Sequence, residues 1–329
     1  MEKYILVTGG AGYIGSHACK ALKAAGYTPV TFDNLSTGHA AAVQFGPLVE
    51  GDLLHPDVLE RVFTEYDIAG VMHFAAFSQV GESVEQPGVY WRNNVVGSMN
   101  LLDAMVRHGV QAIVFSSTCA TYGEHDGVTL NEDTPQLPTN PYGASKRAIE
   151  DMIAGYEAAG KISSVTFRYF NVAGADPDAT VGEWHIPETH LIPLILDAAA
   201  GIRGHITVFG DDYDTADGTC VRDYIHVADL VDAHVLGLER LLAGNAGGVY
   251  NLGTGTGFSV QEVIDVVQQV TEKAVVVERG ERRVGDCARL LSGSTKAIEE
   301  LGWQPTRSDL STMVADAWRW HQTGGYSKN

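Results

Sequence analysis

A glycine-rich turn near the start of the chain most strongly limits the fold. Residues 4–7 (Tyr-Ile-Leu-Val) have the short apolar pattern of a buried strand, and a helical stretch begins a few residues later. Between them, Gly10, Gly12 and Gly15 match G-x-G-x-x-G, while Gly9, Gly12 and Gly15 match G-x-x-G-x-x-G. Glycines allow a tight turn and close backbone approach, so that a pyrophosphate can lie on the helix N-terminus.

A carboxylate follows where a dinucleotide site needs one. A second apolar run, residues 29–32, leads directly to Asp33. At the end of the second strand, such a carboxylate accepts hydrogen bonds from the adenosine ribose and would repel a 2′-phosphate. A glycine turn alone predicts only a flexible loop. Together with the strand, the helix and Asp33, it predicts an NAD site, and NAD is favoured over NADP.

The same strand–helix alternation continues through the first half of the chain. Buried runs recur at residues 48–50, 71–74, 113–116 and 165–170, with helical stretches between them. This order predicts an α/β fold, a Rossmann-like doubly wound parallel sheet, with ligands beyond the carboxyl ends of its strands.

The composition changes after Asn171, where a long polar loop begins. We therefore expect a Rossmann domain over residues 1–171 and a smaller C-terminal α/β substrate-binding domain over residues 172–329. Residues 249–252 resemble a strand that could return to the first sheet.

Tyr142 and Lys146 form a Tyr-x-x-x-Lys pair at the start of a predicted helix. Asn140 is a good N-cap, and Pro141 suits the first helical position. Residues four apart share a helix face, so the two side chains can reach one volume, where a cation favours phenolate over phenol. Such pairs occur by chance on exposed helices. The upstream nucleotide motif makes this one a candidate base.

Charge and cysteine content narrow the functional classes. The net charge is −19, from 22 basic and 41 acidic residues, which argues against nucleic acid or an anionic membrane as a partner. Without an apolar run of 18 residues or more, no membrane span is expected. The four cysteines are far apart and form no C-x-x-C pair, which argues for reduced thiols in the cytoplasm and against a zinc site. We expect no metal ligands.

Taken together, these motifs make the chain similar to the extended short-chain dehydrogenase/reductase family over essentially its whole length. The shorter motifs that carry the likeness lie at residues 8–17, 33–38, 73–83, 115–118, 140–146, 168–175 and 218–230. Within the family, RYFN at 168–171 and VRDYIHVADL at 221–230 resemble the branch of UDP-hexose 4-epimerases. This resemblance implies interconversion of UDP-galactose and UDP-glucose, and a homodimer.

The resemblance also assigns site residues. Those implied to surround NAD are Gly9, Gly12, Tyr13, Ile14, Gly15, Asp33, Asn34, Asp52, Leu53, Phe74, Ala75, Ala76, Ser78, Asn94, Lys146 and Phe170. Those implied to contact the UDP-sugar are Thr118, Tyr142, Asn171, His190, Leu191, Phe209, Arg222, Arg283, Asp286 and Leu290. Tyr142, Lys146 and Thr118 are the implied catalytic set, acting through a 4-keto intermediate that turns before hydride returns to its opposite face.

Two alternatives stay open. The first is another NAD-dependent nucleotide-sugar enzyme, such as an epimerase, a dehydratase or a decarboxylase. Dehydratases typically carry a Thr-Asp-Glu arrangement, whereas this chain has Thr118-Cys119-Ala120. The second is a non-catalytic NAD(H)-binding sensor, which would be expected to lack the tyrosine, lysine and hydroxyl set.

Four positions depart from the commoner family pattern. Thr118 replaces a serine but keeps the hydroxyl, and Ser78 stands where many relatives have a lysine near the cofactor phosphate. His190 stands where asparagine is common. Leu290 aligns with a site near the sugar 2-substituent that is tyrosine in some relatives, so a smaller residue there would admit an N-acetyl group.

Overall fold

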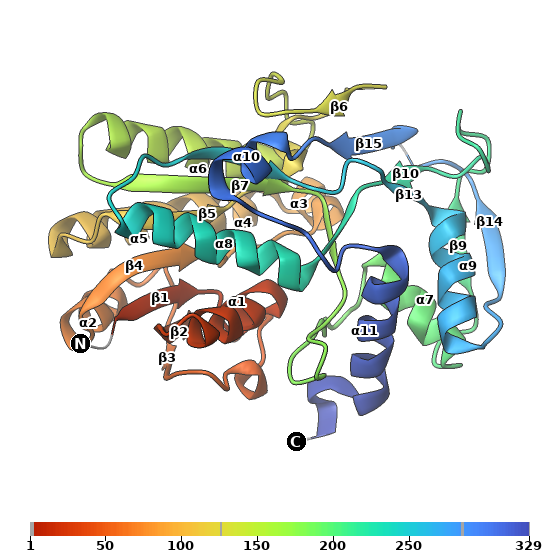
Figure 1. The fold of residues 1–329 in the computed structure, drawn as a ribbon, viewed down its shortest axis with the longest axis horizontal. Helices are drawn as coiled ribbons and strands as arrows, with labels where there is room; N and C mark the ends of the chain where they lie inside the picture. Colours follow the sequence, from red (N-terminus) through yellow and green to blue (C-terminus); the bar gives the residue numbers. More distant parts are fainter. Residues whose placement is uncertain (1–2, 126, 284–285, 329) are drawn as a thin grey trace.

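The central element is a seven-stranded parallel sheet with the order β3-β2-β1-β4-β5-β7-β12 (Figure 1). It belongs to the residues that the computed structural model describes, which are 3–125, 127–283 and 286–328. Its strands are β1 (Tyr4–Thr8), β2 (Thr28–Asp33), β3 (Leu48–Glu50), β4 (Ile68–His73), β5 (Ala112–Ser116), β7 (Ser163–Tyr169) and β12 (Gly248–Leu252). The predicted doubly wound α/β sheet is confirmed.

Helices cover both faces of this sheet. One layer contains α1 (Tyr13–Ala24), α8 (Val227–Leu242) and α10 (Thr295–Leu301). The other contains α2 (Pro56–Glu65), α5 (Gly97–His108) and α6 (Pro141–Ala158). The short helices α3 (Val80–Glu85) and α4 (Pro87–Tyr90) and the π-helix η2 (Trp91–Val96) precede α5.

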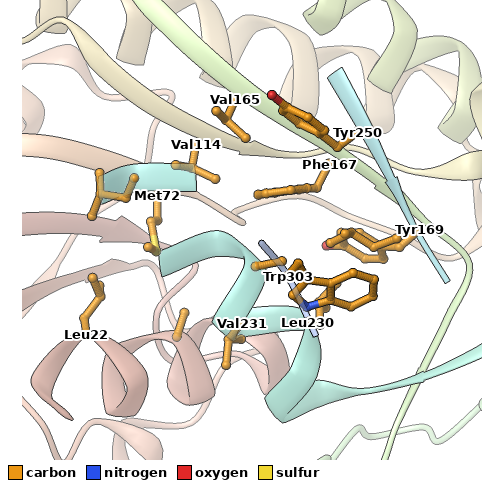
Figure 2. Packing of buried hydrophobic residues seen from close by; sticks show 14 of the residues in the cluster. Leu22, Met72, Val114, Val165, Phe167, Tyr169, Leu230, Val231, Tyr250 and Trp303 are labelled. Atoms are coloured by element: carbon orange, nitrogen blue, oxygen red, sulfur yellow. The ribbon is translucent and has the colours of Figure 1, made fainter. Parts of the chain in front are cut away.

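The two hydrophobic cores follow from strand geometry, because successive side chains of a strand point to opposite faces. In β1, Ile5 and Val7 belong to the core beneath α1 and α8, whereas Leu6 belongs to the core beneath α2 and α5. Figure 2 shows part of the first core, where Phe167 of the sheet packs near Leu230 of α8 and Trp303. Burial on both faces explains why these strands read as continuous apolar runs.

A smaller lobe lies beyond the carboxyl ends of the strands (Figure 1). Its helices are α7 (Leu191–Ala199), α9 (Val260–Thr271) and α11 (Leu310–Thr323), which share a core with β9 (Ile206–Phe209) and, beside it, β14 (Val277–Gly280). A second sheet joins β13 (Phe258–Ser259), β10 (Val221–Arg222), β15 (Arg289–Ser292) and β6 (Thr129–Leu130). Strands β8 (Asn171–Ala173) and β11 (Tyr224–His226) pair with each other, and 3₁₀ turns occur at η1 (Ala40–Ala42), η3 (Cys119–Thr121) and η4 (Gly325–Lys328).

The chain passes more than once between the sheet and the smaller lobe. After residue 171 it returns to pack α8 on the sheet and to add β12 beside β7, with Gly248 opposite Val165. Strand β6, from before residue 171, pairs with β15 of the second sheet. A single division of the chain at residue 171 stays a prediction. Among the described helices, none has the length and apolar character that crossing a membrane requires.

A buried ion pair joins α6 to the sheet. Arg168 of β7 donates from Nε to the Glu150 carboxylate at 3.0 Å and from Nη1 to the Tyr122 hydroxyl at 2.9 Å. Glu150 also accepts hydrogen bonds from Ser117 and from Gln136. Both charged side chains are less than a tenth exposed, so each depends on the other for compensation.

Replacing Arg168 with methionine is expected to destabilise the protein by about 3–5 kcal/mol, because it leaves the Glu150 carboxylate buried without a counter-charge. Urea unfolding would measure the loss. The matched control is Arg107→Met, which removes an arginine from an exposed pair with Glu60 at 2.7 Å and should cost no more than about 1 kcal/mol. Equal losses in the two variants would contradict the role of the Glu150–Arg168 pair.

Candidate active site

The turn between β1 and α1 has no room for side chains at two of its glycines. Gly9 has φ 73°, and a Cβ there would lie 2.6 Å from the backbone nitrogen of Ala75. A Cβ on Gly15 would lie 2.1 Å from the carbonyl oxygen of Gly9. Gly12 is the N-cap of α1 and has no side chain to occupy the helix N-terminus. The turn therefore leaves this end of the helix open to a phosphate group.

The structure distinguishes the two glycine patterns. Gly9, Gly12 and Gly15 border a large cavity. Gly10 is turned toward the second strand, where a Cβ would lie 2.9 Å from the Thr31 side chain. The G-x-x-G-x-x-G pattern therefore faces the ligand space, and Gly10 serves close packing of the turn on β2.

Asp33 is fixed at the carboxyl end of β2. Its two carboxylate oxygens accept hydrogen bonds from the backbone N–H of Ala11 at 3.0 Å and of Leu35 at 2.8 Å. Burial raises the pKa of Asp33, although these hydrogen bonds act against the shift. Nearby, the Asn34 amide donates to Asp52 at 3.0 Å. This rigid carboxylate edge fits ribose hydroxyls and disfavours a 2′-phosphate.

The cavity extends from this turn into the smaller lobe and has a volume of about 1190 Å³. Sites for a single drug-sized ligand measure roughly 300–1,000 Å³, so this cavity is slightly larger than the usual range for one such ligand. The predicted residues that border it are Gly9, Gly12, Tyr13, Ile14, Gly15, Asp33, Asn34, Asp52, Leu53, Phe74, Ala75, Ala76, Ser78, Thr118, Tyr142, Lys146, Phe170, Asn171, His190, Leu191, Arg222, Arg283, Asp286 and Leu290.

Two predicted site residues do not border the cavity. Asn94 is buried in the π-helix, where its amide exchanges hydrogen bonds with the backbone of Phe77 at 2.9 and 3.0 Å and donates to Ser145 at 3.1 Å. Asn94 therefore holds the segment after β4 in place. Phe209, at the end of β9, lies beneath the guanidinium of Arg283 at 4.1 Å and supports that side chain.

Helix α6 brings Tyr142 and Lys146 into the cavity. The side chain of Asn140 accepts from the backbone N–H of Gly143 at 2.8 Å, and Pro141 opens the helix, as the sequence predicts. Lys146 is buried and donates from Nζ to the carbonyl oxygen of Ser116 at 2.8 Å. Thr118, which follows β5, borders the same cavity as Tyr142, and its side chain acts to lower the pKa of the Tyr142 phenol. Tyrosine, lysine and hydroxyl thus meet at the carboxyl ends of the strands.

Burial controls the protonation of this group. It raises the pKa of Tyr142 to about 12, although the hydrogen bond from Thr118 acts in the opposite direction. Burial also lowers the pKa of Lys146 to about 7, against the attraction of Glu150. The net shift is upward and Lys146 is not among its causes, so the lowering of the Tyr142 pKa by Lys146 together with the nicotinamide stays a prediction.

The far end of the cavity carries localised positive charge. Arg222 is held by hydrogen bonds from Nη1 to the carbonyl oxygens of Val221 at 2.9 Å and of Cys287 at 3.0 Å, and by Asp286 at 3.2 Å from Nη2. Arg283 stacks on Phe209 close by. Guanidinium groups in fixed positions suit diphosphate oxygens, and they supply locally what the net charge of −19 lacks.

The smaller lobe also contributes a side chain that packs beside the Thr118 turn. Leu290 of β15 packs against the cluster of Cys119, Tyr122 and Leu130 and borders the cavity. From β8, the amide of Asn171 donates to the carbonyl oxygen of Asp223 at 3.2 Å.

The cavity wall contains a cluster of side chains that the sequence analysis does not predict. His190, expected as a contact of the UDP-sugar, lies together with Glu183, His185 and Glu188. Burial would raise the pKa of Glu183, but the two histidines outweigh it and lower the value to about 2. Conversely, burial would lower the pKa of His185, but the carboxylates raise it to about 10. The sequence does contain an indication of this cluster, because four residues of types that bind metals stand within eight positions. A search for cysteine pairs alone does not detect them.

Comparisons with known proteins agree with this geometry. Residues 5–253 match the model of the NAD dependent epimerase/dehydratase family. The chain is 50% identical to a UDP-glucose 4-epimerase of Rhizobium leguminosarum bv. trifolii, covering 96% of this chain and 97% of that protein.

Solved structures agree as well. One UDP-glucose 4-epimerase structure has a TM-score of 0.97 at 51% identity, covering 99% of this chain and 100% of that one. Another, from Stenotrophomonas maltophila with bound NAD and formylated UDP-arabinopyranose, has a TM-score of 0.95 at 40% identity, covering 98% and 99%. The chain therefore belongs to the NAD-dependent epimerase/dehydratase family.

Proposed function

We propose that this protein interconverts UDP-galactose and UDP-glucose by oxidation and re-reduction at C4 of the sugar. One observation carries the proposal. Tyr142, Thr118 and Lys146 meet in a single cavity that has a dinucleotide turn at one end and two fixed arginines at the other. The similarity to UDP-glucose 4-epimerases along nearly the whole chain supports it.

The first half of the cavity suits NAD, the cofactor of the family. The open N-terminus of α1 would hold its pyrophosphate, and Asp33 would hold its adenosine ribose. When bound, NAD supplies the acceptor and then the donor of the hydride. The protein would orient the bound NAD through Lys146 and through the small residues Ala75 and Ala76, which border the same part of the cavity.

In the proposed reaction, Tyr142 takes the proton of the C4 hydroxyl as hydride leaves C4, and a 4-keto sugar forms. The sugar then turns about its link to the diphosphate, which Arg222 and Arg283 hold in place. Tyr142 returns the proton as hydride is delivered to the opposite face. Thr118, which borders the cavity with Tyr142, orients the hydroxyl. Binding energy far from C4 thus keeps the intermediate bound.

The alternatives fit the site less well. Elimination across C5 and C6 needs an acid and a base near Thr118, where the chain has Cys119 and Ala120. Glu150 lies close to Ser117, but Arg168 engages its carboxylate. A non-catalytic sensor does not require Tyr142, Thr118 and Lys146 to border one cavity.

We propose further that N-acetylated UDP-sugars enter the same site. The support is Leu290, an aliphatic side chain that borders the cavity beside the Thr118 turn. Tyrosine at this position would occupy more of the space near the sugar 2-substituent.

We also propose that the protein acts as a homodimer in the cytoplasm. Support for the dimer comes from three exposed apolar side chains between residues 84 and 99. They are Val84, Trp91 and Met99, which are 63%, 42% and 41% exposed. Support for the location comes from Cys19, Cys119 and Cys220, which are buried free thiols.

The first prediction from the proposed function concerns turnover. Purified protein is expected to convert UDP-galactose to UDP-glucose without added reductant, and Tyr142→Phe should reduce the rate by roughly 10²–10⁴-fold, the usual contribution of a general acid–base group. Sugar analysis after incubation measures both. The matched control is Tyr156→Phe on the same helix, whose hydroxyl bonds Asp103 at 2.5 Å. Full turnover in Tyr142→Phe would remove this residue from its proposed role.

The second prediction concerns pH. The hydrogen bond from Thr118 lowers the pKa of Tyr142, so Thr118→Val is expected to raise it. Because the phenolate is the active base, the acid limb of kcat/KM should move to higher pH, and the rate at neutral pH should fall. Thr118→Ser keeps the hydroxyl and should restore the profile. A lower rate with an unmoved pH profile would mean that Thr118 only positions the substrate.

The third prediction concerns substrate range. Leu290→Tyr is expected to reduce kcat/KM for UDP-N-acetylgalactosamine by roughly 10–200-fold, the usual reach of steric discrimination, and to spare UDP-galactose. Leu137→Tyr, on an exposed side chain, is the control. Equal losses on both sugars, at an unchanged melting temperature, would contradict the role of Leu290.

A further inference from the structure

Four metal-ligating side chains gather in the loop before α7. Glu183, His185, Glu188 and His190 each offer one ligand atom, and these atoms all lie within 4.8 Å of one another. Their spacing along the chain is E-x-H-x-x-E-x-H. The nucleotide and sugar subsites described above do not require this combination of imidazoles and carboxylates.

Two separations within this cluster suit a four-coordinate metal. His185 Nδ1 lies 3.4 Å from Glu183 Oε1 and 3.6 Å from Glu188 Oε2. The other Glu188 oxygen, Oε1, lies 3.6 Å from His190 Nδ1. Tetrahedral zinc with bonds of about 2.0–2.2 Å places its ligand atoms roughly 3.3–3.6 Å apart. A further pair, His190 and Glu183, is hydrogen-bonded and would open slightly around an ion.

The carboxylates are oriented by the backbone and face histidines. Glu188 Oε1 accepts from the backbone N–H of Thr189 at 2.7 Å and of His190 at 2.8 Å, which leaves Oε2 to face His185. Within the described ranges of the chain, neither Glu183 nor Glu188 pairs with lysine or arginine.

The Nδ1 nitrogen of His185 is shielded from solvent and makes no well-formed hydrogen bond, although two carboxylates lie 3.4 Å and 3.6 Å away. Buried polar nitrogens are normally satisfied, and a metal bond would satisfy this one. The Glu183 side chain is only 7% exposed, so a bound ion would also neutralise a buried carboxylate.

We propose that Glu183, His185, Glu188 and His190 bind one divalent cation, best matched by zinc. Two imidazoles and two carboxylates are typical zinc ligands, whereas calcium and magnesium prefer all-oxygen sites. The two carboxylate charges balance a dication. The site is structural, because four protein ligands leave no open position for substrate.

Such a metal would fix the wall of the cavity. The loop is already held at one end, where Trp320 donates to the carbonyl oxygen of Glu183 at 2.8 Å and His39 to that of Trp184 at 2.9 Å. The metal would hold the other end, just before α7, where His185 and His190 border the cavity.

Zinc binding to the full-length, NAD-containing protein tests the proposal. After chelator treatment, titration with Zn²⁺ against a chromogenic chelator should give one ion per chain. Loss of a residue that only supports a metal ligand typically weakens metal binding roughly 10–100-fold. A His185→Gln/Glu188→Gln variant loses two ligands, so its affinity for zinc should fall by more than that. The matched control is His205→Gln/Glu278→Gln, which removes an exposed pair 3.3 Å apart and should bind as the unaltered protein does.

X-ray absorption of the zinc-loaded, unaltered protein tests the ligands without a variant that must fold. Nitrogen and oxygen neighbours at about 2.0–2.2 Å are expected, with no sulfur at about 2.3 Å. Sulfur scattering, zinc binding that is equal in the double variant, or no binding by the unaltered protein would overturn the proposal. The last result would leave a cluster held only by histidine–glutamate contacts.

Discussion

The buried pair between Glu150 and Arg168 fixes the geometry on which the site depends. Tyr142, Lys146 and Glu150 lie four residues apart on α6 and therefore share one face of the helix. Glu150 ties that face to β7 through Arg168, and Lys146 ties it to the end of β5 through the Ser116 carbonyl oxygen. Because these polar groups are buried, breaking one leaves the others unsatisfied, so the helix has one well-defined position.

A buried carboxylate also holds the smaller lobe in position. The Asp223 carboxylate, between β10 and β11, accepts from the backbone N–H of Thr254 at 2.8 Å, of Gly255 at 2.9 Å and of Ser292 at 3.1 Å. It thereby joins the turn after β12 to the end of β15. Arg222 precedes Asp223, and Leu290 lies on β15, so one buried carboxylate sets the distance between the sheet and the substrate end of the cavity.

The sequence predicted what depends on local spacing, and missed what depends on burial. The glycine turn, the Asn140 cap and the one-sided placement of Tyr142 and Lys146 follow from short-range geometry, and the structure reproduces them. The upward shift of the Tyr142 pKa does not follow from the sequence, because its main cause is burial, which depends on tertiary packing. Likewise, Asn94 bonds Phe77 and Ser145, which no spacing in its own helix reveals.

The raised pKa of Tyr142 bears on when this residue accepts and when it holds a proton in the proposed reaction. Burial raises the pKa of Tyr142 to about 12, so nearby positive charge would be needed for this phenol to ionise near neutral pH. An oxidised nicotinamide would supply that charge when bound, and a reduced one would not. In the proposed reaction, Tyr142 would therefore be a better base before C4 is oxidised. It would then hold the proton while the keto sugar turns, ready to return it to either face of the same carbon.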